Sequence, residues 1–120
     1  DVGTSYFLPR LVGAGVAADL MLTGRILGAE DAKEIRLVSQ LVAEEGLQEA
    51  ALAKARAIAE NSEYGVWMTK KGLHSAIDAP SLRQAMEMEN RTQVLGYFTG
   101  CMEESMAAFG EGRKPRWKPL

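Results

Sequence analysis

The first four residues, Asp1-Val2-Gly3-Thr4, place a carboxylate and a turn-forming glycine directly before an expected helix. A carboxylate can act as a general acid or base when a shielded site raises its pKa. The same side chain can instead accept backbone N–H bonds at the helix start, where a neighbouring terminal ammonium would lower its pKa. We favour capping for Asp1, although capping and catalysis do not exclude each other. For Gly3 and Thr4 we favour turn geometry and a threonine cap.

An aromatic residue and several cations lie near the other end of the chain, at Phe109, Arg113, Lys114, Arg116 and Lys118. An aromatic ring can stack on a flat ligand, and cations can pair with phosphate. The alternative is a solvated basic tail with the aromatic ring in the core. The sequence leaves both interpretations open.

The remaining reactive side chains give weaker indications. The chain has one histidine and one cysteine, which argues against a His/Cys zinc site, and we expect no metal. His74 has no second catalytic residue beside it in the sequence, so we expect a surface residue. Cys101 has no adjacent histidine or cationic cluster to activate its thiol, so a nucleophilic role is not expected.

The composition is that of an ordinary globular domain. The 120 residues fit one small domain, with 47% hydrophobic and 25% charged residues. A net charge of −2 provides no general attraction to nucleic acid or to an anionic membrane. The apolar runs are too short to cross a bilayer. The single cysteine fits a reducing compartment, and we expect a cytoplasmic protein without nucleic-acid or membrane partners.

Apolar spacing and turn signals predict a mainly helical chain. A glycine at position 24 is expected to close the second helix in a left-handed conformation. Leu37–Val42 is the only strand-like run, and a lone strand leaves its backbone groups unpaired. We therefore expect it to join a sheet encoded elsewhere or to remain an isolated extended piece. The helices are expected over residues 4–11, 15–23, 29–35, 44–60, 65–77, 80–98 and 101–109.

The start of the chain also favours the later half of a larger protein. It opens on a turn, with no preceding strand and no initiator methionine. Together with the single strand-like run, this predicts that a sheet-bearing part lies outside these residues.

Several short runs occur in order along the chain: Gly3-Thr4, Leu8-Pro9-Arg10-Leu11-Val12-Gly13, Leu22-Thr23-Gly24-Arg25, Met68-Thr69-Lys70 and Met106–Pro115. Together they resemble the C-terminal part of the crotonase superfamily, the enoyl-CoA hydratases and isomerases. The resemblance implies a mainly α fold, the C-terminal helical region of a crotonase-like ββα-spiral fold, with at most one or two short strands. Residues 1–43 would end the crotonase-like core, with helices and one short strand. Residues 44–120 would form the C-terminal helical and oligomerisation region.

The chemistry that the resemblance implies acts on acyl-CoA thioesters through an enolate-type intermediate. Two backbone N–H groups would stabilise the developing charge, and carboxylates would move protons or activate water. In the family those N–H groups belong to the N-terminal part, so these 120 residues alone are expected to be inactive. Coenzyme A would enter as part of the substrate, with no separate cofactor, and the protein would assemble as a homo-oligomer, a trimer or a hexamer.

The resemblance also implies roles for individual residues. Asp1 stands in the Asp-x-Gly-Thr setting in which the dienoyl-CoA isomerase branch has a catalytic aspartate. The implied substrate-binding residues are Gly3, Thr4, Leu8, Phe109, Arg113 and Lys114. The first three would border the acyl pocket, although packing is the commoner role for such a leucine. The last three would contact the adenine or phosphates of coenzyme A.

Two positions depart from the family pattern. Gly112 stands where some members have lysine, and Arg36 stands where the family usually ends a helix with glycine. A left-handed arginine would cost about 1 kcal/mol, so this turn either differs or carries strain. An alternative function of a different class is a free-standing helical interaction module, without catalysis, derived from such an enzyme. In either case we expect exposed apolar helix faces that make the isolated chain self-associate.

Overall fold

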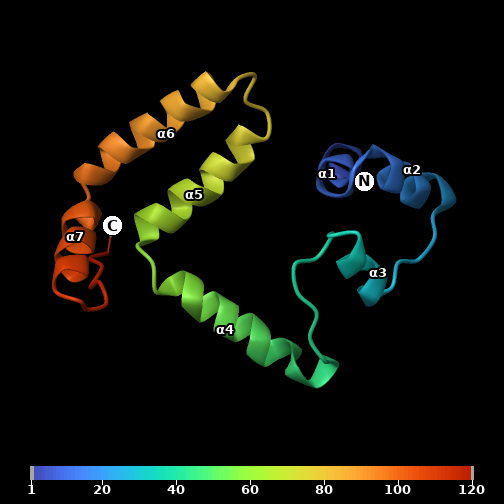
Figure 1. Ribbon diagram of the computed structural model, residues 1–120, viewed down its shortest axis with the longest axis horizontal. Coiled ribbons are helices and arrows are strands. Elements are labelled where there is room, and N and C mark those ends of the chain that lie inside the picture. Colours follow the sequence, from blue (N-terminus) through green and yellow to red (C-terminus); the bar gives the residue numbers. More distant parts are fainter. Residues whose placement is uncertain (1, 120) are drawn as a thin grey trace. The chain divides into compact units, whose positions relative to one another are not determined.

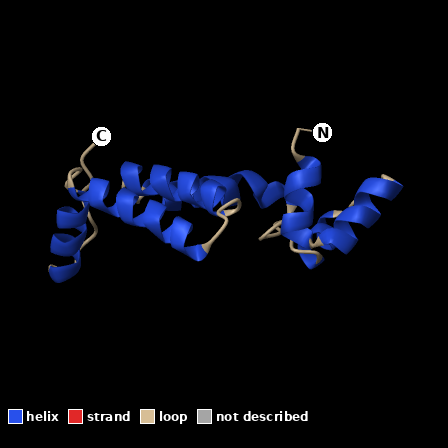
Figure 2. Cartoon of the chain, turned by 90° about the horizontal axis from the view of Figure 1, so that it is seen from above, coloured by secondary structure: helices blue, strands red, loops and turns tan. Residues whose placement is uncertain are grey.

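The computed structural model describes residues 2–119, which form helices joined by turns and loops (Figures 1 and 2). They divide after Ala50 into two compact units, which are described separately below. The different division predicted between residues 43 and 44 concerns the roles of the two parts and stays a prediction. The elements are α1 (Thr4–Val12), α2 (Ala14–Thr23), α3 (Ala29–Glu34), the 3₁₀ turn η1 (Glu44–Gly46), α4 (Leu47–Ala59), α5 (Glu63–Ala76), α6 (Leu82–Tyr97) and α7 (Cys101–Gly110).

In the first unit, α1 and α2 meet at a single glycine. Gly13 has φ 84°, a left-handed value that favours glycine, and its N–H donates to the Pro9 carbonyl at 3.0 Å. The Gly13 carbonyl accepts from Ala17, a residue that is almost completely buried. Helix α2 then ends at Gly24 with φ 63°, so the left-handed glycine expected there is confirmed.

Helix α1 begins at Thr4, so its N-cap is the residue before Thr4. Gly3 is the N-cap residue, with φ 94°, and its carbonyl accepts the N–H groups of Tyr6 and Phe7 at 3.1 and 2.9 Å. Thr4 is already the first helical residue. The cap predicted for Thr4 is therefore wrong, because a glycine without a side chain occupies the capping position.

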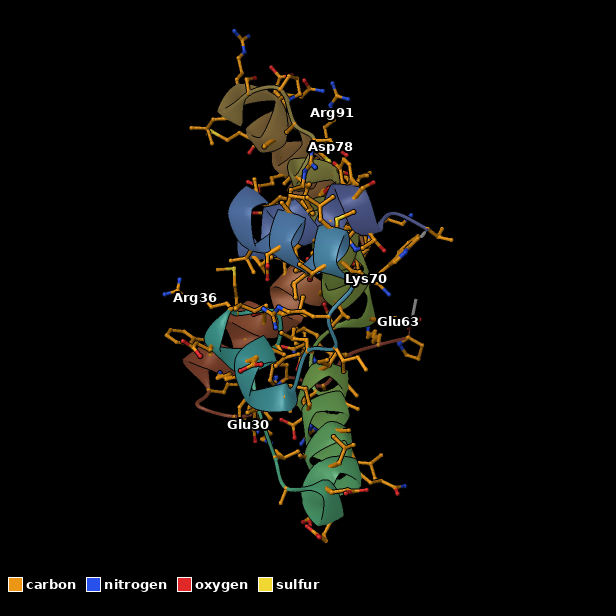
Figure 3. All side chains as sticks on the ribbon, turned by 90° about the vertical axis from the view of Figure 1, so that its right-hand side faces the viewer. Glu30, Arg36, Glu63, Lys70, Asp78 and Arg91 are labelled. Carbon is orange, nitrogen blue, oxygen red and sulfur yellow. The ribbon has the colours of Figure 1, made fainter. Side chains whose placement is uncertain are left out.

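Arg36 adopts the left-handed conformation that the sequence raised as a possibility. Its φ is 62°, its N–H donates to the Lys33 carbonyl at 3.0 Å, and the Leu37 N–H donates to the Ala32 carbonyl at 2.8 Å. These two bonds form a Schellman motif that closes α3, with arginine at the position that glycine usually fills. The Arg36 side chain extends away from the ribbon (Figure 3).

The strand-like run Leu37–Val42 forms no strand within residues 2–119, and its pairing with a sheet encoded elsewhere stays a prediction. The chain bends over residues 37–39 and continues as a loop, and no strand occurs within residues 2–119. The Leu37 N–H is bonded to α3 and cannot join a ladder, while the Lys33 ammonium donates to the Ser39 carbonyl. A strand-like run cannot form a strand when no neighbouring strand accepts its backbone bonds.

The second unit is organised around α5 and α6, which lie side by side in Figure 1. Ser62, which is buried, caps α5 by accepting the Gly65 N–H at 3.0 Å. Ser81 caps α6 in the same way by accepting the Gln84 N–H at 3.2 Å. Helix α7 follows α6 after Gly100, whose φ of 74° gives the chain the left-handed turn between these helices.

Large apolar side chains remain exposed in both units, as the sequence predicts. Examples are Ile26, Leu82 and Phe98, which are 97%, 77% and 84% exposed. The buried hydrophobic residues of the described chain are alanines, at positions 17, 32 and 108. Several helix faces therefore lack a covering layer within residues 2–119. No helix in this range is both long enough and apolar enough to span a membrane.

Candidate functional site

The N-terminal candidates lie at the start of α1. Asp1, the predicted catalytic residue, falls outside the described residues. Gly3 is half-buried with φ 94°, and a Cβ added to it would lie 3.1 Å from the Phe7 ring, so this position favours glycine. Thr4 is exposed and Leu8 is half-buried one helical turn later, which places both on the same side of α1. The structure thus brings these three predicted residues together on one helix.

Tyr6 gives α1 a buried polar group. The Arg10 guanidinium lies over the tyrosine ring at 3.6 Å from its centroid, and the Phe7 ring meets it edge-on at 5.0 Å. The Tyr6 hydroxyl is buried and has no hydrogen-bond partner among residues 2–119. Burying an unpaired hydroxyl is costly, so this group is a donor and acceptor that another polar group or a ligand could use.

The C-terminal candidates lie where α7 ends. Phe109 is 91% exposed, so the alternative that places its ring in the core is wrong. Gly112 has φ 63°, its N–H donates to the Phe109 carbonyl at 3.2 Å, and the Arg113 N–H donates to the Ala108 carbonyl at 3.0 Å. This is a second Schellman motif, and it explains why glycine rather than lysine stands at position 112. It turns the following residues back along α7.

The Arg113 side chain is held by two carboxylates. Its Nη1 and Nη2 atoms donate to the Glu104 oxygens at 2.6 and 3.3 Å, and its Nε donates to Glu111 at 2.5 Å. Glu104 also accepts the Arg116 backbone N–H at 2.5 Å. The guanidinium is therefore engaged on both edges, and a freely solvated tail is not what the structure shows for this residue.

These contacts change the ionisation of both partners. Hydrogen bonds from the Arg113 side chain and from the Arg116 backbone lower the pKa of Glu104 to about 2, against a smaller opposing effect of desolvation. Glu104 and then Glu111 raise the pKa of Arg113 above its ordinary value. Glu104 therefore remains an anion, and Arg113 a cation, across the physiological range.

Lys114 is differently placed. Its ammonium pairs with Glu60 at 3.2 Å, but both side chains are largely exposed, at 83% and 64%. Such a pair contributes little stability, and its lysine can turn to another anion at small cost. Of the predicted C-terminal residues, Phe109 and Lys114 are therefore the ones open to a ligand.

Two cavities adjoin this region. One, of about 490 Å³, lies among α5, α6 and α7 and is mostly apolar, with Met68, Leu73, Met88 and Met102 in its wall. The other, of about 270 Å³, lies beside the start of α7 and includes Arg116 and Lys118. Cys101 and Trp117 line both. Within residues 2–119, no three His, Cys, Asp or Glu side chains are grouped so that they could hold a metal ion.

Three residues that sequence reasoning missed hold the C-terminal segment. They are Glu60, Glu104 and Trp117, and their partners are between 9 and 57 residues away in sequence. Helical spacing cannot reveal such pairs. The one available signal was Gly112, because a glycine just past a helix end favours a chain reversal that brings Arg113 back towards α7.

The comparison with known families settles the relationship. The family model described as enoyl-CoA hydratase/isomerase matches residues 1–119. The chain belongs to the enoyl-CoA hydratase/isomerase family. The resemblance noted in the sequence is thereby confirmed.

Relatives in this family share a substantial part of the sequence. A probable enoyl-CoA hydratase of Mycobacterium tuberculosis is 41% identical over 116 residues, which are 96% of this chain and 41% of the relative. The mitochondrial enoyl-CoA hydratase of Pongo abelii is 34% identical over 116 residues, 97% of this chain and 40% of the relative. The chain thus spans less than half the length of the family members it matches.

Solved structures of the family agree with the helical fold. A probable enoyl-CoA hydratase/isomerase from Mycobacterium abscessus matches with a TM-score of 0.89 and 39% identity, covering 98% of this chain and 46% of the other. An enoyl-CoA hydratase from Bacillus anthracis matches with a TM-score of 0.91 and 34% identity, covering 97% and 45%. The expected fold class, the helical C-terminal region of a crotonase-like fold, is confirmed.

Proposed function

We propose that this chain is the C-terminal portion of an enzyme that acts on acyl-CoA thioesters as a hydratase or isomerase, through an enolate-type intermediate. The observation that carries the proposal is the family match over residues 1–119. The same relationship supports coenzyme A as part of the substrate rather than as a separate cofactor. We expect the 120 residues on their own to be inactive, because the family's charge-stabilising N–H groups belong to its other part.

The proposal assigns roles to two separate sets of residues, one in each unit. Asp1 is the proposed acid or base, and Gly3, Thr4 and Leu8 border the acyl chain. The exposure of Phe109 and Lys114 supports contacts with adenine and phosphate, since a free ring can stack and a free ammonium can pair. Arg113 is the third residue proposed to contact coenzyme A. Its guanidinium, however, is already paired with carboxylates.

We further propose a homo-oligomer, a trimer or hexamer, in the cytoplasm. The exposed apolar side chains of several helices support this proposal, because burying them against another protein surface is favourable. The same surfaces would serve the alternative, a helical interaction module without catalysis.

The decisive experiment measures both coenzyme A binding and enoyl-CoA turnover. It uses the 120-residue chain alone and the product of the complete reading frame in which these residues occur. We expect turnover only from the complete product. Phe109→Ala and Lys114→Ala in that product should each weaken coenzyme A binding by about fivefold, the loss of one stacking or ionic contact.

The matched control is Lys70→Ala, which removes an exposed lysine from α5 (Figure 3). It should leave both binding and turnover unchanged. A complete product without turnover of any enoyl-CoA would overturn the proposed reaction and favour the interaction module. Equal effects of the lysine variants would refute the proposed role of Lys114 while leaving the reaction intact.

A further inference from the structure

The segment that follows α7 is folded against the second unit rather than extended into solvent. After Gly112 reverses the chain, the Arg113 N–H returns to the Ala108 carbonyl at 3.0 Å. Ala108 is 1% exposed, the value of a fully packed residue, although it lies near the end of a short helix. The segment is therefore fixed where it starts.

Glu104 fixes the middle of the segment. Its two carboxylate oxygens accept from both terminal nitrogens of Arg113, and one of them also accepts the Arg116 backbone N–H. A bidentate pair constrains orientation as well as distance. The additional bond constrains the path of the chain directly, because its donor is the main-chain N–H of residue 116 rather than a side chain.

Glu60, beyond the end of α4, fixes the far end. Its main-chain carbonyl accepts the Trp117 indole N–H at 2.7 Å, and its carboxylate pairs with Lys114 at 3.2 Å. Trp117 is half-buried, unlike most large side chains of this unit. The segment thus bridges the end of α4 and the start of α7, two parts of the second unit that are distant in sequence.

We propose that residues 111–117 form a clasp, defined by the contacts of Arg113 and Arg116 with Glu104 and of Trp117 with Glu60. The clasp closes the wall shared by the two cavities around Cys101. Trp117 and Cys101 line both cavities, so release of the clasp opens the space next to the thiol. Arg113 is then a positioning residue, because its bonds to Glu104 hold the segment after α7 against that helix. Phe109 and Lys114 stay exposed in this arrangement. This inference does not depend on the proposed reaction.

The lone thiol provides the test, because Cys101 is the only cysteine in the chain. In the full 120-residue chain, the rate of Cys101 modification by a soluble aromatic disulfide reports opening of the clasp. Glu104→Gln keeps the shape of the side chain but removes the charge that holds Arg113. We expect it to raise the modification rate by about fivefold, the scale of one partly exposed ion pair.

The matched control is Glu87→Gln, which removes the same charge and an ion pair with Arg83 from α6, at a residue that lines neither cavity. It should leave the rate within a factor of about two of the unmodified chain. Deletion of residues 113–120 provides the second variant. It should raise the rate at least as much as Glu104→Gln, and Glu104→Gln should then add nothing in the deleted chain.

Hydrogen exchange separates clasp opening from general unfolding. In Glu104→Gln, exchange should accelerate at the Arg116 amide and the Trp117 indole N–H, while α6 amides keep their protection. An unchanged rate of Cys101 modification in both Glu104→Gln and the deleted chain would overturn the clasp. Loss of protection at the α6 amides together with faster Cys101 modification would also overturn the clasp. The Glu104 carboxylate would then stabilise the whole second unit rather than the clasp alone.

Discussion

The hydroxyl of Tyr64 on α5 donates to the main-chain carbonyl of Thr92 on α6 at 2.7 Å. The close approach of the two helices depends on Gly96, because a Cβ added there would lie 3.2 Å from the edge of the tyrosine ring. Both Tyr64 and Thr92 are half-buried, so water competes little for their bond. This contact is the specific polar link between the two longest helices of the second unit.

Tyr64→Phe should lower the free energy of unfolding of the second unit by about 1 kcal/mol, the usual net contribution of a partly buried hydrogen bond. Urea denaturation followed by circular dichroism measures the change. Tyr97→Phe is the control, because it removes the same hydroxyl from a side chain that is 55% exposed. If the two variants lost equal stability, the bond to Thr92 would have no special role.

The ion pair of Glu104 predicts a dependence of stability on pH. The ordinary pKa of a glutamate is near 4.5, and Arg113 with the Arg116 backbone lowers that of Glu104 to about 2. Because the folded-state pKa lies below the ordinary value, the stabilisation is complete above pH 4.5. It is lost as the pH falls from 4.5 through about 2.

This loss can be isolated by comparison with Glu104→Gln, which has no carboxylate at this position. The difference in melting temperature between the unmodified chain and this variant should be constant near neutral pH and should shrink as the pH falls to about 2. Glu103→Gln, on the same helix, should show no comparable trend. A difference that persists undiminished at pH 2 would show that protonation of Glu104 is not the cause.

Helix boundaries were largely predictable because they depend on local signals. The glycine at position 24 and the pattern from residue 82 to residue 97 each carry their own information about periodicity and capping. The run Leu37–Val42 was harder to predict, because a strand is not a local structure. Its backbone needs a partner, and within the described residues the Leu37 N–H instead closes α3.

The candidate site was predictable only where a motif carried it. Phe109, Arg113 and Lys114 were found through the family-like run near the end of the chain, but their exposure and pairing were not. Glu104 and Glu60 look like ordinary surface carboxylates in the sequence. Only the folded chain shows that one holds Arg113 and the other holds Trp117, because both contacts depend on the reversal at the end of α7.

The left-handed conformation of Arg36 predicts that glycine at this position would stabilise the end of α3. Its φ of 62° places a Cβ in the left-handed region, which costs about 1 kcal/mol relative to glycine. The side chain is exposed, so its loss removes little packing. Arg36→Gly should therefore raise the opening free energy measured by hydrogen exchange at the Leu37 amide by about 1 kcal/mol.

Arg36→Ala is the control: it removes the same charge but keeps the Cβ, and it should give no such gain. Equal protection of the Leu37 amide in both variants would contradict the argument from backbone strain.

The apolar face of α4 predicts how the 120-residue chain behaves in solution. Leu47 and Ile58 are 60% and 49% exposed, and their spacing places them on one side of the helix. Burying such side chains against another surface is favourable, so the chain should self-associate at micromolar concentration. Sedimentation should show species larger than the 13.0 kDa monomer.

Ile58→Glu tests whether this face drives the association. A charge in place of an isoleucine that becomes buried on association should weaken self-association by about tenfold or more, because the apolar contact is lost and the carboxylate must be desolvated. Ala53→Glu adds the same charge to α4 at a position that is rotated by more than a quarter turn from Ile58 around the helix axis. It should have little effect on self-association. If both variants weakened association equally, net charge rather than the apolar face would control it. A strictly monomeric unmodified chain would show that the exposed side chains find no partner in a second copy.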